Sequence, residues 1–323
     1  MDFSRIHKEI NYNIDRSKNI LLVIHQNPDG DAIGAGLSLA NYLKREKRKH
    51  TLFALDCPSG QFDFLPFVES VETNPQIFSQ DIYDTILVLD SGDLMYAGVQ
   101  EYFKEFTYRR PLLVNIDHHH TNQMFGDLNL VDPGASSTSE ILFNYFDDLR
   151  ISVDKEMATC LLTGILLDTG AFTNPATNIA SLRSASKLLI QGADLKKIVT
   201  HVLKNKQIST LKLWGRALSR LKKNQETGFI TTIITQKDLE ECQTDDEGTE
   251  GVANFLNNLS DTKAVLVLRE VPGGKIKGSL RSTDDLIDVS KIATMFGGGG
   301  HKKAAGFTVK GKLKETANGW QIV

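Results

Sequence analysis

The chain has few cysteines, no long apolar run and little net charge. Its three cysteines, Cys57, Cys160 and Cys242, are odd in number and far apart, which is typical of a reduced, cytoplasmic protein rather than of a disulfide framework. The longest apolar run, residues 158–167, is well short of the roughly 20 residues that span a bilayer. Residues 1–7 carry charges where a secretory signal would be apolar. These absences exclude the membrane, fibrous and secreted classes of protein.

Charge of one sign is also scarce, since 37 Lys and Arg stand against 40 Asp and Glu, a net charge of −3. The chain therefore lacks the broad basic surface with which proteins bind long nucleic acids, whereas short or small anionic substrates are compatible with it. A length of 323 residues corresponds to roughly two domains, and 41% hydrophobic residues are enough for packed cores.

Short apolar runs alternate with amphipathic stretches up to about residue 195. Four of these runs are predicted to be buried strands: 19–25, 51–56, 85–90 and 112–117. Helices are predicted over 32–49 and 154–168, and the capping residues within 136–140 start another. Continuous apolar strands that alternate with helices predict a mostly parallel sheet covered on both faces, which is an α/β fold.

A Lys-rich, amphipathic stretch follows and contains the domain boundary. Its lysines are typical of a solvated helix face, and contact with phosphates is the weaker alternative. Beyond it, the predicted elements are strands at 229–235, 265–271 and 277–282 and helices at 250–259 and 286–296. We therefore expect three parts: a parallel-sheet domain covered by helices (1–195), a helical connector (196–224) and a smaller α+β domain (225–323).

Acidic and histidine side chains come at the ends of three predicted strands and one predicted helix of the first domain. In chain order they are His25, Asp29, Asp31, Asp90, Asp117, His118, His119, His120 and Asp168. Because ligands of an open parallel sheet bind outside the carboxyl ends of its strands, we expect these side chains to meet at one edge. Carboxylates that lie so close together repel one another unless cations neutralise them.

Two divalent cations would neutralise four of these carboxylates: Asp29, Asp31, Asp90 and Asp168. With His25 and His118 as nitrogen ligands, the mixed donor set suits Mn²⁺ or Mg²⁺ better than the thiolate-rich sites of structural zinc. Each residue alone has an ordinary alternative, such as a turn, a helix cap, a helix end or a buried histidine with a hydrogen-bond partner. Their joint occurrence at the predicted strand ends favours the metal site.

These motifs resemble, in the same order, the four motifs of the DHH phosphoesterase superfamily: His25-x-x-x-Asp29-x-Asp31, Asp90, Asp117-His118-His119 and Asp168. The later segment Gly297-Gly-Gly-Gly300-His301, continuing to Phe307, resembles the signature of the accompanying DHHA1 domain. The likeness covers nearly the whole chain. Members of the superfamily include the RecJ exonuclease, family II pyrophosphatases, cyclic-dinucleotide phosphodiesterases and nanoRNase/pAp phosphatases.

The resemblance implies two divalent ions, with Mn²⁺ preferred and Mg²⁺ as the alternative. The residues implied for the first ion are His25, Asp29 and Asp90. The residues implied for the second ion are Asp31, Asp90, His118 and Asp168. Asp90 would bridge the two ions, and a hydroxide held between them would attack phosphorus in line.

Further roles also follow from the resemblance. Asp117 would support a neighbouring ligand without binding metal, and His119 would face the scissile phosphate as a catalytic group. No role is implied for His120. In the second domain, the resemblance implies a substrate clamp formed by Arg281, Gly298, Gly299, Gly300 and His301, in which bare backbone N–H groups and a guanidinium hold phosphate. The ordinary alternatives are a flexible glycine loop and a surface arginine.

The stand-alone DHH–DHHA1 group fits this chain best. A RecJ-type exonuclease would need further nucleic-acid-binding domains, a family II pyrophosphatase would lack the glycine tetrad, and a membrane-bound phosphodiesterase would have segments before residue 1. We expect a nanoRNase/pAp phosphatase that cleaves short RNA and dinucleotides such as pApA to mononucleotides and converts pAp to AMP. Such an enzyme needs no long duplex and no membrane, and a homodimer is compatible with it. The alternative is a soluble cyclic di-AMP phosphodiesterase. A non-enzymatic nucleotide-binding protein is disfavoured, because no metal ligand is missing.

Overall fold

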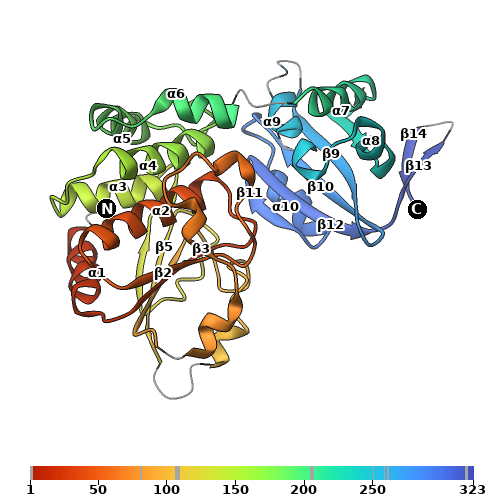
Figure 1. Cartoon of the computed structure of the whole chain (residues 1–323). Helices are drawn as coiled ribbons and strands as arrows, with labels where there is room; N and C mark the ends of the chain where they lie inside the picture. Colours follow the sequence, from red (N-terminus) through yellow and green to blue (C-terminus); the bar gives the residue numbers. More distant parts are fainter. Residues whose placement is uncertain are drawn as a thin grey trace. The chain divides into compact units, whose positions relative to one another are not determined.

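The computed structural model divides the chain into two compact units, Met1–Asn205 and Lys206–Val323 (Figure 1). The residues that it describes are 3–80, 82–105, 110–203, 207–249, 251–257, 259, 262–316 and 319–323. No helix in this described part is both long enough and apolar enough to cross a bilayer.

The described residues of the first unit form a six-stranded sheet in which every pair of neighbouring strands is parallel. Its strands, in spatial order, are β3 (Val71–Glu72), β2 (His50–Phe53), β1 (Ile20–Ile24), β4 (Thr85–Leu89), β5 (Leu112–Asp117) and β6 (Leu128–Val131). The order reverses between β1 and β4. In open parallel sheets, this reversal opens a crevice beyond the carboxyl ends of the two strands.

Helices cover one face of this sheet. They are α1 (Ser4–Arg16), α2 (Gly30–Arg45), α3 (Thr138–Asp148), α4 (Lys155–Asp168), α5 (Ile179–Ile190) and α6 (Leu195–Ile198), which continues as a π-helical turn (Val199–Leu203). Alternate residues of β1 point to opposite faces, so that Leu22 joins the core under the helices. A Cβ at Gly34 would lie 2.5 Å from the carbonyl oxygen of Cys160, so glycine at this position lets α2 and α4 pack closely.

Short 3₁₀ helices and loops cover the other face. Leu21 and Val23 of β1 pack there against Phe53 and Phe78. The 3₁₀ segments of this unit are η1 (Gly60–Phe62), η2 (Val68–Ser70), η3 (Pro75–Gln80) and η4 (Tyr102–Glu105). Both faces are thus covered, which explains why every residue of β1 and β4 is buried.

The second unit has a mixed sheet with the order β11-β12-β10-β9-β8-β7 in its described part. Its strands are β7 (Lys222–Lys223), β8 (Phe229–Ile234), β9 (Ala264–Val271), β10 (Lys275–Arg281), β11 (Gly299–His301) and β12 (Ala304–Lys310), and β13 (Leu313–Thr316) and β14 (Gly319–Ile322) form a separate hairpin. Its helices are α7 (Ile208–Ser219), α8 (Gln236–Cys242), η6 (Asp246–Thr249), α9 (Val252–Leu256) and α10 (Val289–Met295). Leu213 of α7, Leu239 of α8 and Leu256 of α9 share one core, whereas Val289 of α10 belongs to another.

The α/β fold with a second, mixed-sheet domain confirms the predicted fold class. The predicted strands at 19–25, 85–90 and 112–117 correspond closely to β1, β4 and β5. The predicted helix at 32–49 instead begins at Gly30, because Asp29 caps it, and ends at Arg45. The predicted helix at 250–259 is observed as α9, and residues 250 and 258 lie outside the described residues.

The predicted connector at 196–224 contains α6, the π-helical turn and α7, and its residues 204–206 lie outside the described part. The division between units falls inside this range, after Asn205. Leu213 and Ala217 of α7 are buried in the core of the second unit. This helix is therefore packed as part of the second unit, although it lies in the range predicted as a connector.

Candidate metal centre

The predicted acidic and histidine residues of the first unit lie together beyond the carboxyl ends of its strands. His25 follows β1, Asp90 follows β4, and His118 follows β5. Two helices supply the rest, since Asp29 and Asp31 start α2 and Asp168 ends α4. Three overlapping groups have ligand atoms within 4.8 Å of one another: His25–Asp29–Asp90, Asp31–His118–Asp168 and Asp90–His118–His119.

Asp90 lies at the centre of this arrangement and is 2% exposed. One carboxylate oxygen, Oδ2, is 3.7 Å from Nε2 of His25, and the other, Oδ1, is 3.6 Å from Nε2 of His118. Oδ1 also accepts a 2.9 Å hydrogen bond from Oγ1 of Thr138. The backbone of Asp90 is left-handed, with a φ of 57°, a conformation that few residues other than glycine adopt. Its two oxygens therefore face two different histidines, as a bridging ligand requires.

The first group is held by local hydrogen bonds. Nδ1 of His25 is 2.8 Å from the carbonyl oxygen of Gln26, which orients Nε2 toward the carboxylates of Asp29 and Asp90. Asp29 caps α2, because its Oδ1 accepts hydrogen bonds from the backbone N–H groups of Asp31 and Ala32. The cap fixes the carboxylate of Asp29 beside His25, with 3.7 Å between Oδ1 and Nε2.

The second group is held by the N-terminus of α3. Asp31 is fully buried, and its two oxygens accept hydrogen bonds of 2.6 Å and 2.9 Å from the backbone N–H groups of Thr138 and Ser139. Nε2 of His118 is 3.3 Å from Oδ2 of Asp168. A Cβ at Gly164 would lie 2.5 Å from Oδ1 of Asp31, so α4 can pass this carboxylate only with glycine there.

The electrostatics of this cluster favour cations. In the part of the chain that the structure describes, its carboxylates form ion pairs with histidines and with no Lys or Arg. Burial and the charge of Asp90 raise the pKa of Asp31 to about 7, while burial and the charge of Asp29 raise the pKa of Asp90 to about 6. Burial and the charge of Asp31 also raise the pKa of Asp168 well above its usual range. Divalent cations would remove this repulsion, and the oxygen and imidazole donors fit Mn²⁺ or Mg²⁺.

His119 is oriented by a different contact. Its Nδ1 is 2.7 Å from Oδ1 of Asp117, whose Oδ2 accepts a 2.6 Å hydrogen bond from Nδ2 of Asn122. Burial opposes a charged imidazole, but the bond to Asp117 and the charge of Asp90 outweigh it and raise the pKa of His119 to about 9. Asp117 is fully buried, whereas the His119 side chain is 25% exposed. His119 is thus a cationic donor at the open side of the cluster, and its bond to Asp117 distinguishes it from His118.

Some residues that shape the site were not predicted from the sequence. Thr138 and Ser139 were predicted only as the start of a helix, although their backbone N–H groups bind Asp31. Asn122 and Tyr96 carried no recognisable signal, because their loops have no periodic pattern. Conversely, His120 is exposed and belongs to none of the three groups.

The predicted substrate residues of the second unit lie at the ends of β10 and α10. Nε of Arg281 donates a 2.7 Å hydrogen bond to Oδ1 of Asn254, and Nη1 donates to the carbonyl oxygen of Leu280. Burial lowers the pKa of this guanidinium. Within the described residues it has no carboxylate partner, so its charge is not compensated there.

In the glycine tetrad, residues 297–300, two glycines are needed for packing, whether or not a ligand binds there. A Cβ at Gly298 would lie 2.1 Å from the carbonyl oxygen of Gly306, and a Cβ at Gly300 would lie 2.6 Å from that of Ala304. Gly299 has open space around its Cα. The backbone of β12 therefore accounts for Gly298 and Gly300. His301 lies in β11, where it pairs with Ala304.

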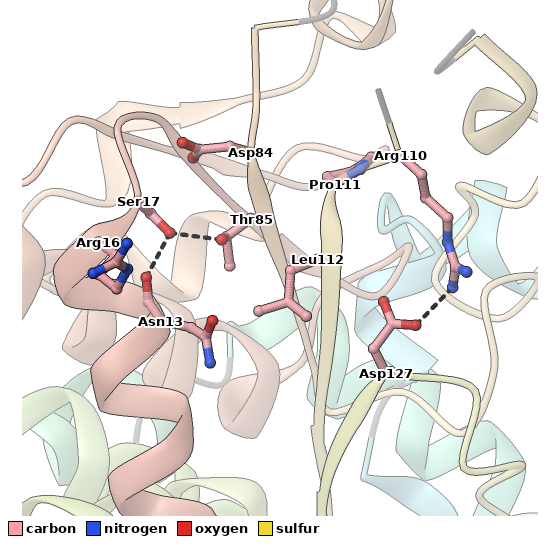
Figure 2. A pocket seen from close by; sticks show the side chains of 9 residues that line it. All are labelled: Asn13, Arg16, Ser17, Asp84, Thr85, Arg110, Pro111, Leu112 and Asp127. Carbon is pink, nitrogen blue, oxygen red and sulfur yellow. Dashed lines mark hydrogen bonds and ion pairs between the residues drawn. The ribbon is translucent and has the colours of Figure 1, made fainter. Parts of the chain in front are cut away.

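A cavity of about 530 Å³ lies elsewhere, where β4 and β5 begin (Figure 2). Both of its carboxylates have partners: Nη2 of Arg110 donates a 2.9 Å hydrogen bond to Asp127, and Asp84 accepts from the backbone N–H groups of Lys18 and Asn19. None of the predicted site residues lines it. The predicted acidic and histidine residues lie at the opposite edge of the sheet, beyond the carboxyl ends of the strands.

Known proteins resemble the chain over both units. The model of the DHH family, N-terminal domain, matches residues 19–165, and that of the DHHA1 domain matches residues 227–318. The bifunctional oligoribonuclease and PAP phosphatase NrnA of Thermus thermophilus is 32% identical over 293 residues, which are 90% of this chain and 84% of that protein. The cyclic-di-AMP phosphodiesterase GdpP of Geobacillus thermodenitrificans is 25% identical, and the match covers 89% of this chain and 44% of that protein.

A solved structure has the same fold. The crystal structure of an exopolyphosphatase-related protein from Bacteroides fragilis superimposes with a TM-score of 0.86 and is 26% identical in sequence. The match covers 94% of this chain and 90% of that one. Similarity in sequence and in fold thus extends over the cluster described above and over the second unit.

Proposed function

Because the chain belongs to the DHH phosphoesterase family, it is a hydrolytic enzyme, and we propose that it cleaves short RNA to mononucleotides and converts pAp to AMP. Dinucleotides such as pApA are the smallest RNA substrates in this proposal. The observation that carries it is the cluster centred on Asp90, with both carboxylate oxygens facing histidines. The most similar of the relatives described above bears the name of both activities.

Two divalent cations complete the proposed site, Mn²⁺ rather than Mg²⁺ because imidazoles contribute to it. The proposed ligands are His25, Asp29 and Asp90 for one ion and Asp31, Asp90, His118 and Asp168 for the other. When bound, such ions supply positive charge for the phosphoryl oxygens and a nucleophile at neutral pH. The elevated carboxylate pKa values support this proposal, because they reflect a repulsion between buried carboxylates that cations would relieve.

His119 is the proposed proton-bearing group. In the metal-free protein its pKa is raised to about 9 despite burial, chiefly by the bond to Asp117, and Asp117 and Asn122 fix the ring. From this position it would donate a hydrogen bond to a non-bridging phosphate oxygen or to the leaving oxygen. Asp117 acts through His119 and binds no metal in this proposal.

The second unit is proposed to hold the substrate. Arg281 has no carboxylate partner in the described region, which supports a role in binding a phosphate. Gly299 and His301 would add a backbone and a side-chain donor, and Gly298 and Gly300 let this segment pack closely against β12. We further propose that the enzyme works in the cytoplasm on short, single-stranded substrates. Its three free cysteines are consistent with a reducing compartment.

Hydrolysis of cyclic di-AMP is the second candidate, which the similarity to GdpP favours. That similarity covers less than half of the longer protein, so the linear substrates come first. One experiment separates the two. The purified, Mn²⁺-loaded protein is given pAp, pApA, a five-residue RNA and cyclic di-AMP, and the released mononucleotide is quantified by chromatography.

We expect fast release of AMP from the linear substrates and little from cyclic di-AMP. A preference for cyclic di-AMP would overturn the proposed substrate class in favour of the second candidate. Turnover that persists in EDTA would overturn the metal-dependent mechanism altogether. Light scattering on the same preparation tests whether the enzyme is a homodimer.

A further inference from the structure

The loops that follow β4 and β5 expose an aromatic ring and two thioethers, and the ring lies beside His25 of the metal centre. The exposed fractions are 47% for Tyr96, 68% for Met95 and 56% for Met124. Single exposed apolar side chains are common on protein surfaces, so the position of Tyr96 beside the charged cluster, rather than its exposure alone, points to a ligand.

Tyr96 belongs to the metal centre by position. Its ring centroid is 5.0 Å from that of His25, with 39° between the ring planes. Burial and the charges of Asp29 and Asp90 raise the pKa of its hydroxyl, so the phenol end lies within the field of the carboxylates. One part of the ring thus packs on a proposed metal ligand, while nearly half of the side chain stays accessible.

The loop that carries Tyr96 is fixed rather than loosely attached. The backbone N–H of Tyr96 donates a 2.6 Å hydrogen bond to Oδ1 of Asp93, and Oδ2 of Asp93 accepts from Nε2 of Gln123. The backbone N–H of Gln123 in turn donates to the carbonyl oxygen of Gly92. Because the two loops are bound to each other, the exposed ring is held in place before any ligand arrives.

We propose that Tyr96 is a stacking platform for the base of the nucleotide whose phosphate enters the metal centre, with Met95 extending its apolar surface. Because its centroid is 5.0 Å from that of His25, the ring adjoins the place where a phosphate bound at the cluster would lie. Stacking on an aromatic ring accepts every base, because each base has a π face, and a thioether packs well at the edge of such a stack. The platform would let one site process RNA of any sequence. This inference rests on the proposed function and specifies its substrate as a nucleotide with a base rather than any phosphate ester.

The test compares two substrates with the same phosphates, pAp and the base-free ribose 3′,5′-bisphosphate. In Tyr96→Ala, the ratio of kcat/KM for pAp to kcat/KM for the base-free compound should fall about tenfold, the scale of one lost base stack. Tyr96→Phe keeps the ring and should keep the ratio. Tyr12→Ala removes an exposed tyrosine from α1 and is the matched control.

A merely structural ring would give a different result. If Tyr96 only supported His25, Tyr96→Ala would impair both substrates equally and weaken Mn²⁺ binding, and the unchanged ratio would overturn the platform. Calorimetric titration of the Mn²⁺-loaded protein with AMP and with ribose 5-phosphate provides a test that needs no turnover. A preference for AMP that disappears in Tyr96→Ala supports the platform even if pAp is not hydrolysed, which would contradict only the proposed reaction. Equal affinity for both ligands in the parent protein would overturn the platform.

Discussion

Acidic side chains at the two edges of the parallel sheet have different surroundings. At the amino edge, Asp127 binds Arg110 (Figure 2). Asp127 also accepts from the backbone N–H of Leu113, and Asp84 accepts from two backbone N–H groups. At the carboxyl edge, Asp31 and Asp90 are more deeply buried and face histidines and other carboxylates. At the first edge, groups of the chain itself compensate the carboxylates. At the second edge, cations are needed to compensate them.

This difference locates function better than the shape of the surface does. The amino edge has a cavity of about 530 Å³, yet neither of its two carboxylates, Asp84 and Asp127, faces another carboxylate, and both bind hydrogen-bond donors of the chain. Burying carboxylates next to carboxylates destabilises a fold, and proteins retain such groups where a ligand offsets the repulsion. The uncompensated charge of the buried carboxylates therefore identifies the functional site, whereas a cavity by itself does not.

The largest effect is expected from Asp90→Ala. Loss of the residue that faces both histidine groups should reduce kcat on pApA by about 1,000-fold or more, since each bound metal contributes several kcal/mol of charge stabilisation. Asp127→Ala at the amino edge is the matched control and should turn over close to the parent rate. Equal losses in the two variants, or activity retained in Asp90→Ala, would contradict the distinction between the edges.

Thr138→Val sharpens the comparison within the carboxyl edge. It removes the hydrogen bond that orients Asp90 while preserving the shape of the side chain. Losing such a contact should weaken Mn²⁺ binding about 10- to 100-fold, as measured by calorimetric titration. Thr138→Ser keeps the hydroxyl and should restore most of the affinity. An unchanged affinity in Thr138→Val would show that Asp90 needs no such support.

Arg281→Ala extends the comparison to the second unit, where an uncompensated charge has the opposite sign. Removing a charged hydrogen bond to substrate phosphate should raise KM for pAp about tenfold and change kcat less. Lys277→Ala removes an exposed cation from the same strand and serves as control. If initial-rate measurements give the parent KM for every substrate, Arg281 is not part of the clamp.

The smallest effect concerns stability against pH. The pKa values of Asp31 and Asp90 are about 7 and about 6 in the fold against 3.8 ordinarily, so the folded, metal-free state holds protons more tightly than the unfolded chain. Stability in EDTA should therefore fall as pH rises from about 4 to 7. The pKa values of His25 and His119 are raised from 6.5 to about 9, so stability should continue to fall as pH rises through that range. We expect the thermal midpoint to drop by about 5 °C across this range.

Saturating Mn²⁺ should abolish most of that decline, because cations replace the protons. Thermal scans at several pH values, with and without EDTA, provide the measurement. A midpoint in EDTA that rises with pH would mean that the carboxyl edge is compensated within the chain after all.

The strands that precede the site residues were predicted from the sequence better than the contacts that hold those residues in place. The strands before His25 and Asp90 are continuous apolar runs, and a parallel sheet brings their ends together regardless of detail. The capping of Asp31 by α3 depends on a contact between residues more than 100 positions apart, which no local pattern encodes. The short strand β6 was missed because it has only four residues, one of them polar, which is too short a pattern to identify a strand.

The backbone of Asp90 has a consequence for how this enzyme can evolve. A left-handed conformation costs an L-residue about 1–2 kcal/mol, and glycine would adopt it without that cost. Selection for thermal stability alone would therefore replace the central carboxylate, and only selection for turnover retains it. Stability and activity therefore compete at this one position.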